Sequence, residues 1–297
     1  MERLLTKNLM FLLFAAFLSS SAGGCSFVPT AELRIFRESV VAANTAATPV
    51  LDELSGTERK AKRDAVALRE KPAIRAGTRV DFNPADAAYF SEIGDGPATS
   101  LFRRGHHVLD RLSDVLVVLA TGATADTDAA AIEALALEVA GLADLVQPGI
   151  GAAADLALAV LHPALRALSA ELGRREANRV IAVVQERKLV KAITGSLAGA
   201  TPAMFNLMAV DARLRVTSVH ATAESAPAYA ERVARLRLVL SNYVVLLQRV
   251  DDAWDEAVKA TAAKSSGNVA ALTERVGELR AAAVATRKAY AEMNAAR

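Results

Sequence analysis

Two long apolar stripes follow one another in the C-terminal third of the chain. In residues 229–261, and again in residues 269–293, an apolar or small side chain recurs every three or four positions without a slip. This spacing places the side chains on one face of an α-helix, as in coiled coils and helical bundles. Residues 262–268 separate the stripes, and Ser-Ser-Gly-Asn at residues 265–268 predicts a tight turn. The pattern therefore predicts an antiparallel helical hairpin. The stripe residues are Tyr229, Val233, Leu236, Leu240, Tyr243, Leu247, Val250, Trp254, Ala257 and Thr261, then Val269, Leu272, Val276, Leu279, Ala283, Thr286, Tyr290 and Met293.

The hairpin also predicts the surroundings of Trp254, the only tryptophan of the chain. Trp254 lies on the same stripe as Leu247 and Val250, so we expect its ring to be buried although acidic residues flank it. A turn at residues 265–268 would bring Trp254 level with Leu279 on the opposing helix.

A third stripe predicts a long N-terminal helix over residues 30–70, with Thr30 as its N-cap. Pro49 lies off this stripe and is expected to kink or split the helix near Thr48. The helix is similar in length to the hairpin arms, so we expect it to pack along them. Its stripe residues are Leu33, Phe36, Val40, Ala43, Ala47, Val50, Leu54, Ala61, Ala65 and Leu68.

The composition favours closely packed helices. Hydrophobic residues make up 53% of the chain but aromatic residues only 5%, so the apolar content is mostly Ala, Leu and Val. We predict an all-α protein, an elongated antiparallel helical bundle with a long C-terminal hairpin and a more compact, alanine-rich helical lobe. In this prediction residues 25–297 form a single domain, made of the long helix 30–70, the lobe 84–195, and the long helices 196–297 that end in the hairpin.

The central part of the chain predicts several shorter helices. Asn83 followed by Pro84 is typical of an N-cap and the first helical position, and predicts a short helix to residue 93. Glycines and prolines then divide the sequence into further helices. We expect these over residues 97–120, 128–147, 152–172, 174–194 and 196–224.

The first 25 residues have the layout of a secretory signal. Residues 2–7 are charged at three positions, residues 9–18 form an uncharged apolar run, and small residues lead to Cys25, the only cysteine. The apolar run is too short to span a bilayer as a stable helix. We therefore expect residues 1–24 to be a signal peptide.

The end of this segment, Ala22-Gly23-Gly24-Cys25, resembles the lipobox of bacterial lipoproteins. The resemblance implies lipid, such as palmitate, on Cys25, although Ala22 stands where that family usually has Leu, Val or Ile. Ser26 lacks the aspartate that retains such proteins in the inner membrane, which implies an outer-membrane anchor facing the periplasm. The alternative is cleavage after Ala22, which would give a soluble secreted protein.

The charge and the cysteine content exclude several classes of function. Without the signal the chain has 33 basic and 32 acidic residues, which does not favour a nucleic-acid partner. With Cys25 modified, no thiol is left for a disulfide, a metal or a nucleophile. We expect no cofactor and no small-molecule substrate.

The one cluster with metal-binding residue types is His106, His107, Asp110 and Asp114. Two adjacent histidines on a helix point about 100° apart, whereas zinc needs three or four converging ligands. We interpret the cluster as a polar helix face. The other two histidines, His162 and His220, are interpreted as helix-end and surface residues, and no Ser or Thr nucleophile can be assigned.

Three charged stretches are interpreted as solvated or internally paired surfaces. An acidic band lies on continuous helix rather than on the bent loop that calcium needs. The alternative for the basic stretches is contact with an anionic partner such as lipid headgroups or cell-wall polymer. The band consists of Asp251, Asp252, Asp255 and Glu256; the basic stretches are Arg59, Lys60, Lys62, Arg63, Arg69, Lys71, Arg75 and Arg79, and Arg174, Arg175, Arg179, Arg187, Lys188 and Lys191.

The function predicted from these patterns is a membrane-anchored, non-enzymatic envelope lipoprotein. It would act as a helical scaffold or protein-binding module, with an envelope protein as its partner. The alternative is a membrane-active, pore-forming-like protein that uses the apolar segment 148–161. That segment is short for a membrane span, and Asp155 interrupts it.

Overall fold

The computed structural model describes residues 30–121, 125–143, 176–186, 188–217, 225–262 and 266–295. All regular structure in these ranges is helical, which confirms the all-α prediction. Residues 1–24, Cys25, the segment 148–161, His162 and His220 lie outside the described residues. The elements are α2 (Thr30–Arg75), a 3₁₀ turn η1 (Pro84–Asp86), α3 (Ala87–Phe90), α4 (Pro97–Thr121), α5 (Ala125–Ala143), α7 (Glu176–Glu186), α8 (Leu189–Thr217), α9 (Ser225–Ala262) and α10 (Ser266–Ala295).

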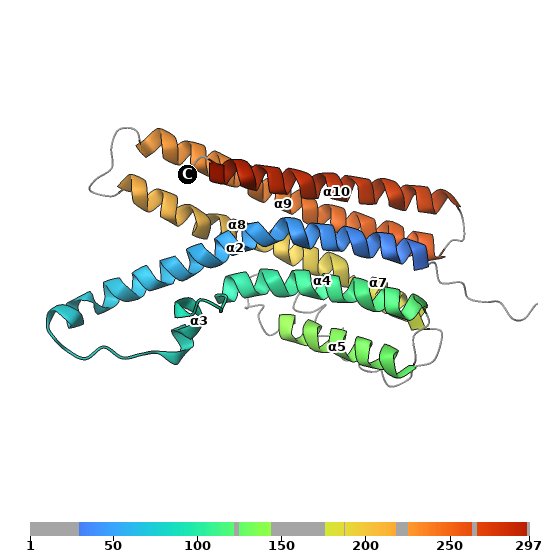
Figure 1. Ribbon diagram of the computed structural model, residues 1–297, viewed down its shortest axis with the longest axis horizontal. Coiled ribbons are helices and arrows are strands. Elements are labelled where there is room, and N and C mark those ends of the chain that lie inside the picture. The colour runs from blue at the N-terminus through green and yellow to red at the C-terminus, as the bar shows by residue number, and fades with distance from the viewer. Residues whose placement is uncertain are drawn as a thin grey trace, which may run out of the picture.

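The helices form an elongated bundle with α2 running through its middle (Figure 1). The predicted hairpin is present: α9 and α10 pack along one another, and α2 contacts both, as expected from its stripe. α2 also contacts α4 and α8, and α5 packs on the outside of α4. The buried apolar residues form one continuous cluster that includes side chains from α2, α4, α5, α7, α8, α9 and α10.

The stripe of α2 is buried only in the first part of the helix. The predicted positions are buried as far as Leu54, and Val66 is the last buried residue of α2. The three predicted positions after Leu54 are wrong: Ala61 is only partly buried, Ala65 is exposed and Leu68 is 70% exposed, because the helix leaves the bundle. Pro49 does not split α2, since the flanking Ala47 and Val50 are fully buried and hold the helix in the core.

The helix boundaries after residue 174 differ from the prediction. No helix ends near residue 195; instead α7 and α8 are separated at Lys188, whose φ of 51° is left-handed. α8 then continues through Pro202 to Thr217. The periodicity missed this break because a lysine in the left-handed region carries no sequence signal, unlike glycine.

The register of the hairpin also differs from the prediction. Trp254 lies level with residue 273 rather than with Leu279. The reason is that α9 ends at Ala262 and α10 begins at Ser266, so the chain reverses earlier than expected. The contacts that set the register join Arg249 to Glu278 (3.1 Å), Asn242 Nδ2 to the Ala285 carbonyl (3.3 Å) and Arg235 Nη1 to the Glu292 carbonyl (2.8 Å).

Trp254 is buried, as predicted, with 2% of its surface exposed. Its ring packs against Phe36 of α2, with 5.5 Å between the ring centroids. Its Nε1 donates a hydrogen bond of 2.9 Å to Gln185 Oε1 in α7. Trp254 therefore joins the hairpin to α2 and α7, which are more distant in sequence than the predicted partner α10.

The N-terminus of α4 is capped by a residue of α2. The buried Glu58 carboxylate accepts hydrogen bonds from the backbone N–H of Ala98 (3.1 Å) and of Thr99 (2.9 Å), and from the Thr99 hydroxyl (2.8 Å). A carboxylate here satisfies N–H groups that a helix leaves unpaired. Gly96 allows this approach, because a Cβ there would lie 2.3 Å from the Glu58 carboxylate carbon.

We expect Trp254→Ala to lower the free energy of unfolding by about 3–5 kcal/mol, because it empties a buried site and leaves Gln185 unpaired. The control is Asp252→Ala, two positions away. Its half-exposed carboxylate pairs with Arg249, and its loss should change stability by less than about 0.5 kcal/mol. Urea unfolding followed by circular dichroism measures both. Equal effects would contradict the described packing of Trp254.

Gly96→Ala should lower the free energy of unfolding by about 1–3 kcal/mol, because the new methyl group displaces the Glu58 carboxylate from the α4 N-terminus. Gly56→Ala in α2 is the matched control. A Cβ at Gly56 meets nothing within 4 Å, so this change should stabilise the helix by up to about 1 kcal/mol. The same unfolding measurement compares the two. A stabilising Gly96→Ala would show that Glu58 does not cap α4.

Candidate functional site

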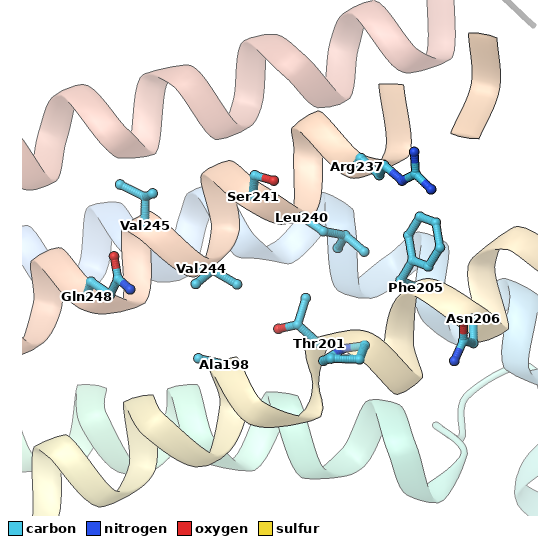
Figure 2. Close-up of a pocket in the computed structure, with 11 residues that line it drawn as sticks. Ala198, Thr201, Phe205, Asn206, Arg237, Leu240, Ser241, Val244, Val245 and Gln248 are labelled. Atoms are coloured by element: carbon cyan, nitrogen blue, oxygen red, sulfur yellow. The ribbon is translucent and has the colours of Figure 1, made fainter. Parts of the chain in front are cut away.

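An open groove lies between α8 and α9, and Figure 2 shows it with α2 behind these two helices. Its volume is about 610 Å³, within the range of about 300–1,000 Å³ that is common for ligand sites. The lining residues are Ala198, Thr201, Pro202, Phe205 and Asn206 of α8, with Arg237, Leu240, Ser241, Val244, Val245 and Gln248 of α9.

The centre of the groove is apolar and its ends are polar. Leu240 and Val244 point from α9 toward α8, while Arg237 lies at one end and Gln248 at the other (Figure 2). The Thr201 hydroxyl donates to the Leu197 carbonyl at 3.1 Å, so its one donor hydrogen is already used within α8. Such a groove suits an elongated ligand that has an apolar central surface and polar groups at its two ends.

The surface around the groove carries little charge. Residues 192–210 of α8 and residues 238–248 of α9 contain no Asp, Glu, Lys or Arg. The single charged lining residue is Arg237, whose guanidinium lies 5.7 Å from the centre of the Phe205 ring. No acidic side chain in the described ranges pairs with Arg237, so its charge is available to an occupant.

α8 is also the one described helix that is long and apolar enough to cross a membrane. The segment Leu189–Val210 has 22 residues and a mean hydropathy of 1.2, with 39% of it buried. A core helix of a soluble protein can satisfy the same criterion, so this is weak evidence for a span. The buried side of α8 includes Leu197, Met204 and Met208, which pack in the bundle core.

The structure separates the predicted polar cluster on α4. His106 is buried, so its assignment to a polar helix face was wrong, whereas His107 is half-exposed and lies 3.4 Å from Glu138. Asp114 pairs with Arg37 of α2. Burial, with Asp114 nearby, raises the pKa of Asp110. Among the described residues no three His, Cys, Asp or Glu side chains gather as metal ligands would.

His106 forms a buried polar network with two other helices. Its Nδ1 lies 2.8 Å from Asn44 Oδ1 in α2, and its Nε2 lies 2.9 Å from the Tyr243 hydroxyl in α9. Burial lowers the pKa of His106 to about 4 and raises the pKa of Tyr243. The neutral ring can therefore donate to Asn44 and accept from Tyr243. Because both titratable groups are buried and bonded to one another, the network is structural rather than a site open to substrate.

A sequence signal for this network was available. Phe102, His106 and Leu109 are four and three positions apart, which places His106 on the same helix face as two apolar residues. A histidine on such a face is expected to be buried and hydrogen-bonded. Its partners Asn44 and Tyr243 lie 62 and 137 positions away along the chain, so sequence spacing could not identify them.

The acidic band lies on continuous α9, as predicted, and two of its four residues pair within the chain. Asp252 pairs with Arg249 (2.9 Å) and Glu256 pairs with Lys259 (2.8 Å). Burial and the neighbouring Asp255 raise the pKa of Asp251. No functional ligand is needed to explain this band.

The first part of the N-terminal basic stretch bonds to the segment that precedes α4. The contacts given next confirm intramolecular pairing for Arg59, Lys62 and Arg63. Arg59 Nη1 donates to the carbonyls of Ser91 and Glu92 (both 3.1 Å), Arg63 Nε donates to the Tyr89 carbonyl (3.0 Å), and Lys62 lies 2.8 Å from Asp86.

We expect His106 to make stability depend on pH. Its folded pKa of about 4 lies below the ordinary value of 6.5, so the unfolded chain binds the proton first as the pH falls. The contribution of His106 to the free energy of unfolding is complete above pH 6.5. About 3 kcal/mol of this contribution is lost as the pH falls to 4. The pH dependence of the unfolding free energy should therefore be shallower in His106→Gln. The exposed His107→Gln is the control and should keep the wild-type slope. A wild-type slope in His106→Gln would contradict a buried neutral ring.

The chain matches no family model, no curated protein and no solved structure. A function must therefore be argued from the groove, the buried network and the surface chemistry of the chain itself.

Proposed function

We propose that the chain is a membrane-anchored, non-enzymatic envelope lipoprotein that binds another protein in the α8–α9 groove. Lipid on Cys25 would anchor it to the outer membrane, facing the periplasm. The observation that carries the proposal is the open, largely apolar groove between two long helices, with Arg237 as its one charged lining residue. The lipobox-like sequence at residues 22–25 supports the anchor.

The shape of the groove favours an amphipathic helix as the occupant. The groove follows α9 from Arg237 to Gln248, which at 1.5 Å per residue is about 16 Å, or three helical turns. Helices commonly bind by laying an apolar face into such a groove. An acidic side chain at one end of the partner helix would pair with Arg237, which has no acidic partner of its own in the described ranges.

The chemistry of the groove supports binding rather than catalysis. Arg237 is its only charged or readily titratable lining residue, and general acid–base or nucleophilic catalysis needs at least one further group within reach. The buried His106 and Tyr243 bond to each other and are not exposed to a substrate. A continuous core beneath the groove would hold it rigid, which limits the entropy lost on binding.

The second candidate is a membrane-active protein, and it stays a prediction. The segment 148–161 on which it was based lies outside the described residues. The observation in its favour is the apolar length of α8. Because α8 packs against α2, α4, α7 and α9, insertion would require it to leave the bundle core. We therefore favour the protein-binding function.

A photo-crosslinking residue at Val245 tests the proposed groove. Val245 lines the groove and is 42% exposed, and Val284 on α10 is a matched control at 55%. In cells that make the lipidated chain, we expect a discrete crosslinked protein from position 245 and none from position 284. Adding Ser241→Trp, which narrows the groove from an exposed position, should reduce the crosslink about ten-fold or more.

Equal crosslinking from both positions would show nonspecific contact and would contradict the proposal. So would a crosslink that Ser241→Trp leaves unchanged while the variant remains folded by circular dichroism. The same crosslinking experiment in a Cys25→Ser chain tests the two parts of the proposal separately. A crosslink that persists in this chain would show that groove binding does not need the lipid.

A further inference from the structure

A second surface, which we call the distal arm, consists of residues 68–93. It comprises the last turns of α2, the following loop, η1, α3 and the residues just after α3. Figure 1 shows α2 extending away from the other long helices before the chain returns to α4. No residue of α2 beyond Val66 is buried, so the bundle does not cover this part of the helix.

The distal arm exposes large apolar side chains to an unusual degree. Phe82 is 75% exposed and Ile93 is 99% exposed, although both side chains are ones that folding normally buries. Half of the large apolar side chains that are exposed in the described ranges lie here, and a concentration of this kind marks an interaction surface. The six are Leu68, Ile74, Val80, Phe82, Phe90 and Ile93.

Four basic and four acidic residues lie among these apolar ones, so the arm has no net formal charge and its attraction to an anion depends on which charges are paired. Asp86 pairs with Lys62, which precedes the arm. Arg69 lies 3.7 Å from Glu70, and Arg79 lies 3.0 Å from Asp81, but these exposed pairs contribute little. Lys71 and Arg75 are exposed, and no acidic side chain in the described part of the chain pairs with either. Their charge is therefore available to an anionic partner.

The tip of the arm is a built turn rather than a frayed helix end. Gly77 has a φ of 64° and ends α2 in the left-handed conformation that favours glycine. The Thr78 N–H donates to the Ala73 carbonyl at 2.9 Å, and the Gly77 N–H donates to the Ile74 carbonyl at 3.2 Å. These bonds pair carbonyl groups of the last helical turn, so the end of α2 is a defined structure.

We propose that the distal arm binds the surface of an anionic lipid bilayer. Aromatic and aliphatic side chains next to Lys and Arg are the combination found in segments that enter the headgroup region. Side chains as exposed as Phe82 and Ile93 can enter a fluid interface without a concave partner. The unpaired Lys71 and Arg75 supply the attraction to phosphate groups. The arm shares no residue with the α8–α9 groove, so this proposal is independent of the one above.

The test uses the unlipidated chain from residue 26 onward, which keeps every described helix. We expect it to co-sediment with vesicles of phosphatidylglycerol and phosphatidylcholine much more strongly than with phosphatidylcholine alone. Lys71→Gln with Arg75→Gln should weaken this binding about 25-fold, since each basic residue contributes about five-fold. Phe82→Ser with Ile93→Ser should weaken it about ten-fold.

Matched controls lie outside the arm. Leu137→Ser with Val284→Ser removes apolar side chains that are 54% and 55% exposed on α5 and α10, and binding should be unchanged. Arg104→Gln with Arg111→Gln removes two exposed charges from α4 and should have less than about a two-fold effect. Circular dichroism confirms that each variant is folded.

Three results would overturn the proposal. The first is equal binding to neutral and anionic vesicles. The second is a loss in the control pairs as large as in the arm pairs. The third is binding to soluble polyphosphate but not to vesicles, unaffected by Phe82→Ser with Ile93→Ser, because the arm would then recognise an anionic polymer by charge alone.

Discussion

The hydrogen bonds among Asn44, His106 and Tyr243 fix how three long helices sit against one another. The surrounding core is mostly Ala, Leu and Val, whose contacts are strong in sum but not directional. Helices with regular apolar stripes could slide by a turn, about 5.4 Å, and still bury similar area. A slipped arrangement would leave both ring nitrogens of the buried His106 without a hydrogen-bond partner. The free-energy cost of these two unpaired groups exceeds the small difference in apolar burial between the two arrangements.

Together with two other contacts of α2, these hydrogen bonds position α4 and the hairpin relative to α2. Asn44 bonds to His106 of α4, which in turn bonds to Tyr243 of α9. Phe36 packs against Trp254 of the hairpin, and Glu58 caps α4. These three α2 residues lie in the part of the helix that precedes Val66, the last buried position. The rest of α2 takes no part in these contacts, so its side chains can change without loss of stability. For this reason the distal arm can expose large apolar side chains.

Local periodicity accounts for what the sequence predicted well. The stripes predicted the hairpin and the burial of Trp254, because one helix face is defined by residues three and four apart. The hairpin register was wrong because it depends on where the chain reverses, and residues 262–266 carry no unambiguous signal. Glu58 and the groove were missed for a different reason: each depends on residues more than 30 positions apart, whose relative placement the sequence does not encode locally.

The two exposed surfaces differ in chemistry, and the difference argues for separate partners. The groove is largely apolar with a single cation at one end, and such a site recognises shape more than charge. The distal arm exposes large apolar side chains beside the unpaired cations Lys71 and Arg75, and such a surface suits a lipid interface rather than a fitted partner. α2 alone is about 69 Å long, so Thr30, next to the proposed anchor, and the arm lie at opposite ends of one rigid helix. A lipid at Cys25 and a bilayer contact at the arm would hold the bundle at two distant points. The groove would stay open between these two points, because α2 lies behind α8 and α9 there (Figure 2).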